Sequence, residues 1–284
     1  MLSDPALQDW LTQQQLQVIG TETVSGGCVA SCYKLTLSDG RVCFLKQQRG
    51  ADSAQFAAEA AGLEALGQTG GLKTPQVLWH SADSLVLEYL APAERTADFM
   101  QRLGEGLAQQ HAQPSEQFGF VCDTWCGATR QPNTLTQDGY RFFAEQRLLY
   151  LGNICVDKAL LSTVDLNRLE DLCTRLSDLI PEHAPVLLHG DLWSGNVHTG
   201  PNGEPVLIDP AVYQGWPESE LAMTLLFGGF DPAFYRAYEA NANILPDWRD
   251  RAALYNLWHL LNHLSLFGRS YQYEVTEILR RYAG

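Results

Sequence analysis

Two aspartates and an asparagine in the C-terminal half of the chain have the spacing of a phosphoryl-transfer site. Asp191 and Asn196 share one short polar stretch with four residues between them, and Asp209 follows a second apolar stretch. In enzymes that transfer a phosphoryl group from ATP, the first aspartate of such a set meets the substrate hydroxyl, and the other two residues hold magnesium. The spacing therefore predicts Asp191 as a catalytic group and Asn196 and Asp209 as ligands of Mg2+.

The segments around these residues are predicted to be short strands. An apolar pair at 187–188 enters the polar loop as a buried strand, and the turn Asn202-Gly203 separates residues 197–198 from 206–208, as in a β-hairpin. An Asp-x4-Asn spacing is common in polar loops and can arise by chance. The arrangement strand, loop, strand, aspartate favours a catalytic loop instead.

The N-terminal part carries the residues expected to hold the phosphates of ATP. Strands are expected at 17–24, 33–37 and 42–46. Gly26, Gly27 and Cys28 lie between the first two, and small residues at a hairpin tip let backbone amides approach phosphate closely. A glycine pair at such a tip is more often only a turn. Lys46, at the end of the third strand, matches the lysine that neutralises phosphates and assists catalysis in kinases.

A helix is expected after the third strand, with Ser53 as its N-cap. Its apolar positions recur at helical spacing and are Phe56, Ala60, Leu63 and Leu66. Glu59 lies on this helix and is predicted to pair with Lys46 and orient it toward the nucleotide. The alternative is a solvated glutamate on the helix surface. The presence of Lys46 and of the catalytic loop favours the ion pair.

A further apolar strand at 85–90 is predicted to connect two lobes. Its last residues, Glu88, Tyr89 and Leu90, would present backbone groups to the adenine edge of ATP. The alternative is an ordinary strand end with an exposed glutamate. The position of this strand, between the lysine-bearing part and a helical remainder, favours the connecting role.

Helical patterns dominate beyond residue 96. They cover residues 96–111, 138–158, 165–179, 218–226, 232–241, 248–267 and 271–282. The stretch 119–138, rich in Gly, Pro and Asn, is expected to be a long irregular insertion. The chain is therefore predicted to be α+β, with a sheet-rich N-lobe at 1–90, a larger helical C-lobe at 91–284 and ATP in the cleft between them.

Composition and charge agree with a folded enzyme. Hydrophobic residues make up 45% and charged residues 18% of the 284 residues. The net charge of -14 argues against nucleic-acid and anionic-membrane partners, which require a basic surface. No apolar run approaches the roughly 20 residues of a membrane span. The first residues lack the features of a signal peptide and instead predict an amphipathic helix with Leu7, Trp10 and Leu11 on one face. A cytoplasmic protein is expected.

The seven cysteines are expected to be free thiols in a reducing compartment. Two cysteine pairs, at 28/32 and 122/126, are closely spaced, but no second ligand pair with zinc-like spacing accompanies them. His259 and His263 share a helix face that would suit a metal, yet no acidic or cysteine residue is adjacent. We therefore interpret this face as packed into the C-lobe.

Longer strings resemble the fructosamine kinase (ketosamine-3-kinase) family, within the protein-kinase-like superfamily that also holds aminoglycoside phosphotransferases and choline kinases. The matching strings are 26–28, 189–196, 209–213, 221–224, 226–230 and 261–263. The resemblance spans nearly the whole chain. It implies a two-lobed fold, ATP and Mg2+ as cofactors, and phosphorylation of the 3-hydroxyl of a ketosamine, free or protein-bound, in protein deglycation. Which adduct is preferred, fructosamine, ribulosamine or erythrulosamine, is left open.

The resemblance also suggests roles for individual residues. Trp193 is expected to face the acceptor, with a buried structural tryptophan as the alternative, and His189 to brace the loop or contact substrate. Cys28 matches a loop cysteine associated with redox-controlled dimers, so the protein is expected to be a monomer or a redox-dependent homodimer. Three departures from the family pattern, at Trp216-Pro217, Glu220 and Arg269, are expected to alter loops on the substrate side.

Two other functions remain open at this point. One is a different small-molecule hydroxyl kinase of the aminoglycoside or choline kinase type, against which the Trp193-Ser194 pair argues. The other is a non-catalytic ATP-binding scaffold. Such scaffolds normally lack one of the catalytic groups, whereas this chain has all five: Lys46, Glu59, Asp191, Asn196 and Asp209.

Overall fold

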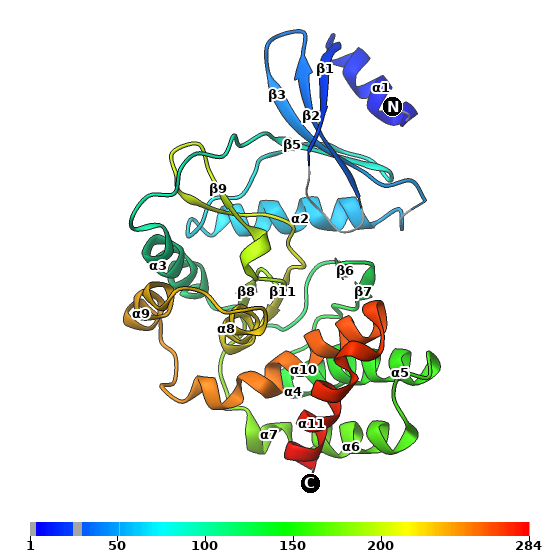
Figure 1. The fold of residues 1–284 in the computed structure, drawn as a ribbon, viewed down its shortest axis with the longest axis vertical. Coiled ribbons are helices and arrows are strands. Elements are labelled where there is room, and N and C mark those ends of the chain that lie inside the picture. Colours follow the sequence, from blue (N-terminus) through cyan, green and yellow to red (C-terminus); the bar gives the residue numbers. More distant parts are fainter. Residues whose placement is uncertain (1–3, 25–29, 51, 284) are drawn as a thin grey trace.

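The structure is a computed structural model that describes residues 4–24, 30–50 and 52–283 (Figure 1). A sheet with two helices occupies one end of the molecule, and a larger, mostly helical region occupies the other. This arrangement is the α+β class that the sequence predicts, with a sheet-rich part and a larger helical part. Within the described ranges, no helix is both long enough and apolar enough to cross a membrane.

The sheet has five strands, and all neighbouring strands are antiparallel. In spatial order they are β1 (Val18–Thr23), β2 (Ser31–Leu37), β3 (Val42–Gln47), β5 (Ser84–Glu88) and β4 (Val77–His80). Side chains alternate between the two faces of β3. Cys43 and Leu45 pack with α1 (Pro5–Gln13), while Phe44 packs with α2 (Gln55–Gln68). The same alternation turns Lys46 toward α2.

The two N-terminal helices largely follow the predicted pattern. On α1, Leu7 and Leu11 are buried and Trp10 stacks on Trp79 with ring centroids 5.5 Å apart. On α2, all four predicted apolar positions are buried. The predicted cap at Ser53 is wrong, because the helix begins after Ala54 and no side chain caps it.

The helical region forms one large core. Its helices are α3 (Phe99–His111), α4 (Gly139–Phe143), α5 (Tyr150–Asp157), α6 (Thr163–Thr174), α7 (Leu176–Leu179), α8 (Pro217–Leu226), α9 (Pro232–Asn241), α10 (Trp248–Phe267) and α11 (Gln272–Ala283). A π-helical segment, Ala144–Leu149, joins α4 to α5. Short 3-10 turns span Ser194–Asn196 and Arg269–Tyr271. The helices predicted from residue 96 onward are confirmed, with shifts of a few residues at their ends.

Three short antiparallel pairs complete the fold. The predicted hairpin is confirmed as β9 (Val197–Thr199) with β10 (Pro205–Leu207). The predicted strand at 187–188 is β8 (Val186–Leu188), which pairs with β11 (Tyr213–Gly215). The expectation of an irregular insertion at 119–138 is wrong in part, because β6 (Thr124–Cys126) and β7 (Thr129–Gln131) form a hairpin there.

Arg147, in the π-helical segment, anchors the residues that follow this hairpin. Its guanidinium donates hydrogen bonds to the carbonyl of Pro132 and to Asn133 Oδ1, both at 2.7 Å. It also lies 4.2 Å from the centroid of the Tyr213 ring. Burial lowers the pKa of Arg147 to about 10, which still leaves the group charged at neutral pH. A buried guanidinium with these partners holds the hairpin against the helices.

Residues 69–73, which follow α2, are bonded to the helical region. Gln113 Nε2 donates to the carbonyl of Thr69 at 2.7 Å, and the amide of Leu207 donates to the carbonyl of Lys73 at 2.9 Å. Leu72 is buried in the helical core. Gly71 allows this approach, because a Cβ there would lie 2.4 Å from the carbonyl oxygen of Gly106.

Two of the sequence departures lie in the helical region. Trp216 is buried in an aromatic cluster that includes Phe118, Tyr140 and Tyr255. Arg269 is exposed and donates to the carbonyl of Ala159 at 2.9 Å. One departure thus fills the core and the other lies on the surface, and their effect on substrate choice stays a prediction.

Candidate active site

A cavity of about 680 Å³ lies between the sheet and the helical region. Most of the residues predicted for the site border it: Lys46, Glu59, Glu88, Tyr89, Leu90, Asp191, Trp193, Asn196 and Asp209. Gly26, Gly27 and Cys28, predicted to contact phosphate, lie outside the described residues. The fold thus gathers groups from both ends of the chain around one space of ligand size.

Lys46 lies at the centre of an ion-pair network. Its Nζ is 2.5 Å from Glu59 Oε1 and 2.6 Å from Asp209 Oδ1, and the residue is 6% exposed. Burial disfavours the charged amine, but the two carboxylates outweigh burial and raise the pKa of Lys46, so the group stays positive. The structure thus pairs Lys46 with Glu59 as the sequence predicts, and adds Asp209 as a second partner.

Asp209 has an unusual backbone conformation. Its φ of +55° lies in the left-handed region, which residues other than glycine rarely adopt. Such strain persists only where the surrounding structure holds it, and it concentrates at functional sites. The conformation leaves the Asp209 carboxylate beside Lys46 at the edge of the cavity.

The loop after β8 closes on itself through Asn196. Asn196 Nδ2 donates to the backbone carbonyl of Asp191 at 2.8 Å and to Asp191 Oδ2 at 3.1 Å. Burial, with the carboxylates of Asp209 and Glu220 acting in the same direction, raises the pKa of Asp191 to about 7. A carboxyl group with a pKa near neutrality is well matched to accept a proton from a hydroxyl.

His189 belongs to the scaffold of this loop. Its side chain is fully buried, with Nε2 at 2.8 Å from the carbonyl of Ile208 and Nδ1 accepting from the amide of Asp191 at 3.3 Å. Both ring nitrogens are thus engaged inside the protein. Of the two roles considered from the sequence, bracing fits the structure and a substrate contact does not.

Glu220, on α8, binds the backbone of the same loop. Its carboxylate accepts hydrogen bonds from the backbone amides of His189 and Gly190, the second at 3.1 Å, and the residue is 2% exposed. From the sequence, Glu220 was only a departure from the family pattern, and its role in holding this loop was missed. The sequence alone gave no signal for it, because the burial of Glu220 is evident only in the fold.

We expect Glu220→Gln to lower kcat and the melting temperature together. The amide nitrogen of glutamine cannot accept a hydrogen bond, so one buried N–H would lose its partner, at about 1–3 kcal/mol. Thermal unfolding and steady-state kinetics test this.

Glu218→Gln is the matched control for Glu220→Gln. Glu218 lies two residues earlier on α8, is also buried, and forms a bidentate pair with Arg251 at 2.7 Å. Its loss should destabilise the fold without touching the loop. If both variants lose kcat to the same extent, Glu220 has no specific role in positioning the loop.

The end of β5 and the two residues after it border the cavity. The carbonyl of Leu90 accepts a hydrogen bond from His198 Nε2, on β9, at 2.8 Å. Phe44, Leu87 and Ile208 add apolar walls, which suit the flat faces of an aromatic base. The role of His198 was missed from the sequence, because nothing near it in the chain points to residue 90.

Trp193 forms another part of the cavity wall. Its ring packs edge to face with Phe227, with centroids 6.2 Å apart. Gly195 also lies against the indole, because a Cβ there would come within 2.3 Å of it. Trp193 thus packs on Phe227 and Gly195 at the border of the cavity.

Comparison with known proteins gives consistent matches over the full length. The family model for fructosamine kinase matches residues 5–283. A probable ketoamine kinase of Synechocystis sp. is 39% identical, covering 95% of this chain and 92% of its own length. The chloroplastic protein-ribulosamine 3-kinase of Oryza sativa subsp. japonica is 32% identical, covering 98% and 83%.

Solved structures agree with these matches. A crystal structure assigned as a fructosamine-3-kinase from Thermobifida fusca superposes with a TM-score of 0.87 at 31% identity, covering 96% of both chains. An aminoglycoside phosphotransferase matches with a TM-score of 0.60 at 14% identity, covering 98% of this chain and 99% of its own. At that identity the second likeness shows the fold alone.

Proposed function

This chain belongs to the fructosamine kinase family, and from that premise we propose that it transfers a phosphoryl group from ATP to the 3-hydroxyl of a ketosamine. The observation that carries the proposal is the set of Lys46, Asp191, Asn196 and Asp209 around one cavity. The names of the relatives support the ketosamine as acceptor. A role in protein deglycation follows, because phosphorylation there makes the adduct labile.

ATP would lie across the cavity, with its adenine against the connecting strand at Glu88, Tyr89 and Leu90. Lys46, held by Glu59, would neutralise the phosphates. We propose the lobe boundary at this strand, with residues 1–90 as N-lobe and 91–284 as C-lobe. Gly26, Gly27 and Cys28 remain the predicted phosphate-binding turn, and Cys28 the predicted redox position.

Two side chains at the border of the cavity, Asn196 and Asp209, fit a magnesium ion. Asn196 turns its amide nitrogen to Asp191, so its amide oxygen is the atom left for a cation. Asp209 adds a carboxylate, and both are the hard oxygen donors that magnesium prefers. The ion would supply positive charge against the phosphate oxygens as the bond to the leaving group breaks.

Asp191 would accept the proton of the acceptor hydroxyl as the phosphoryl group is transferred. The pKa of about 7 supports this role, because the group can bind a proton in the transition state and release it afterwards. Trp193 would pack against the apolar face of the sugar part of the acceptor. Lys46 and the cation would stabilise the charge spread over the transferred group.

A screen of magnesium-dependent ATP consumption tests the proposal. Fructosyl-, ribulosyl- and erythrulosyl-lysine, free and on protein, would serve as acceptors, with choline, an aminoglycoside and homoserine as competitors. We expect turnover with at least one ketosamine and none with the competitors. Turnover with a competitor alone would overturn the ketosamine assignment and retain the kinase, whereas no turnover with any acceptor would contradict both.

A further inference from the structure

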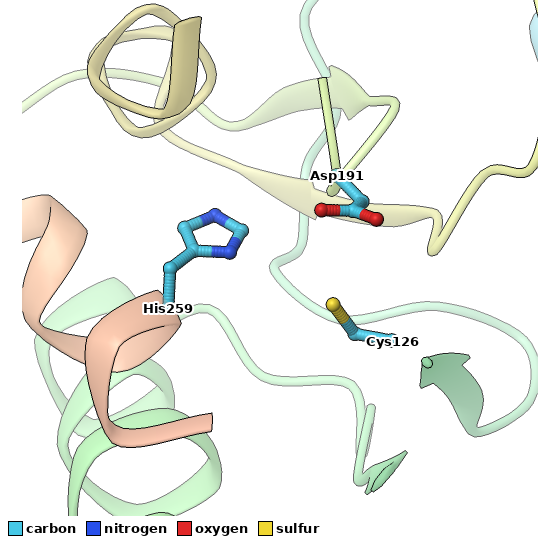
Figure 2. A group of neighbouring side chains, drawn as sticks. All are labelled: Cys126, Asp191 and His259. Atoms are coloured by element: carbon cyan, nitrogen blue, oxygen red, sulfur yellow. The ribbon is translucent and has the colours of Figure 1, made fainter. Parts of the chain in front are cut away.

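A thiol, a carboxylate and an imidazole meet beneath the catalytic loop. Cys126 comes from β6, Asp191 from the loop after β8 and His259 from α10, and their ligand atoms all lie within 4.8 Å of one another. Figure 2 shows the three side chains around one shared space. The sequence-based conclusion that His259 has no acidic or cysteine neighbour is therefore wrong, since the fold supplies both.

His259 brings a nitrogen that lacks a partner. Its Nδ1 is buried and makes no hydrogen bond with any residue that the structure describes. Such an atom costs about 1–3 kcal/mol, so it marks a place where a ligand or water belongs. Burial, followed by the effects of His263 and Arg147, holds the pKa of His259 well below its usual range, so the ring is neutral and has a lone pair to share.

We propose that Cys126, Asp191 and His259 form a zinc site, in which one Zn2+ ion is bound by the thiolate, a carboxylate oxygen and an imidazole nitrogen. Sulfur, oxygen and nitrogen are the donors that proteins use for zinc, and three protein ligands leave the fourth position to water. Tetrahedral ligands around zinc lie about 3.5 Å apart. The ligand atoms are at most 4.8 Å apart, so side-chain movements of about 1 Å bring them to the separations that zinc requires.

The surroundings of the three ligands suit this ion. Asn262 lies beside Cys126, donates to its carbonyl at 3.3 Å, and favours the thiolate. The thiolate and the carboxylate together cancel the charge of Zn2+, so the complex adds no net charge near Arg147. Trp125 and Gly127, which flank Cys126, and Asp191 itself border the main cavity, so the three ligands lie next to it.

Binding exchanges a proton for the metal. Burial holds the pKa of Cys126 well above its ordinary value, so the thiol is protonated without a metal. Formation of the sulfur–zinc bond releases that proton to solvent. The site is therefore not a reactive thiolate waiting for an oxidant, and proton release on addition of zinc is a measurable signature.

Zinc at this site would inhibit the kinase. A carboxylate oxygen of Asp191 bound to zinc is no longer available to accept the hydroxyl proton, whereas the adenine and phosphate positions stay open. This inhibitory effect rests on the proposed function. Metal binding itself does not, so its measurement is independent of whether the phosphoryl-transfer assignment holds.

Cobalt(II), which takes the same ligands with visible absorption, is the probe for binding. We expect one equivalent per chain to give tetrahedral absorption bands and a thiolate-to-cobalt charge-transfer band, both removed by competing zinc. Cys126→Ser and His259→Leu should lose the bands and weaken zinc binding by at least roughly tenfold. Cys122→Ser, in the same segment, is the matched control and should keep both properties.

Two results would overturn the proposal. One is the absence of a charge-transfer band in the parent protein, and the other is an unchanged band in Cys126→Ser. Because a variant can fail to fold, zinc-edge X-ray absorption of the parent protein gives a second measurement. The spectrum should show one sulfur atom together with nitrogen and oxygen atoms bound to zinc. A spectrum with no sulfur bound to zinc would contradict the site.

Activity assays with buffered free zinc and excess magnesium test the inhibitory effect. We expect zinc to inhibit the parent protein reversibly, lowering kcat and leaving KM for ATP unchanged. In Cys126→Ser, with activity normalised to that variant's own zinc-free rate, this inhibition should be largely lost. Inhibition that persists in Cys126→Ser would place zinc at the magnesium position instead.

Discussion

Replacing Asp191 by alanine should lower kcat by roughly 10²–10⁴-fold, the usual contribution of a positioned proton acceptor. ATP binding should survive, because the groups proposed to hold the nucleotide, Lys46 and the connecting strand, do not depend on this carboxylate. Single-turnover kinetics and nucleotide titration separate the two effects. Near-wild-type turnover in a pure preparation would refute the role of Asp191.

The folded-state stability of such a variant provides an independent control. The pKa of Asp191 is raised to about 7 in the folded protein. Because the folded state binds this proton more tightly than the unfolded state, the protonated carboxyl adds to the free energy of unfolding at acidic pH. That contribution is lost as the pH rises through about 7. The neutral isostere in Asp191→Asn should therefore raise the melting temperature more at pH 8 than at pH 5, measured without nucleotide or magnesium. A lower melting temperature would mean that lost activity reflects damage to the fold.

Asp209→Asn should weaken magnesium-ATP binding and activity together, by roughly 100-fold or more. The change removes a hard anionic ligand, and even residues one step away from a metal commonly cost 10–100-fold when replaced. Asparagine tolerates the left-handed backbone conformation well, so φ at this position need not change. The dependence of kcat/KM on magnesium concentration is the measurement.

The exposed Asp157 provides a control for Asp209→Asn. Asp157→Asn makes the same chemical change at the last residue of α5 and should leave the magnesium dependence untouched. If Asp209→Asn also keeps the parent dependence, a different carboxylate holds the metal.

Local sequence patterns were sufficient where a contact follows from strand or helix periodicity. Alternation along β3 turns Lys46 to the face that α2 covers, and helical spacing along α2 turns Glu59 toward it. The hairpin of β9 and β10 follows likewise from a turn dipeptide between apolar residues. Each of these contacts depends on residues that lie within one or two elements of each other.

Contacts between distant segments could not be predicted in this way. Strands of three residues, such as β6 and β7, are too short to show an alternating pattern, so the hairpin was taken for a loop. Cys126 and His259 come from opposite ends of the C-terminal region, and only the packed core brings them to Asp191. The role of Glu220 was missed for the same reason, since its partners are backbone amides of another element.

The attachment of residues 69–73 to the helical region has a mechanical consequence for α2. The residues after that helix are bonded through Thr69 to Gln113, just beyond α3, and through Lys73 to β10, and Leu72 is part of the C-terminal core. Closure of the cleft would then pivot about this anchored end. We therefore expect Glu59 to stay beside Lys46 with and without nucleotide, because the anchor fixes the end of α2 and the sheet packs on its length.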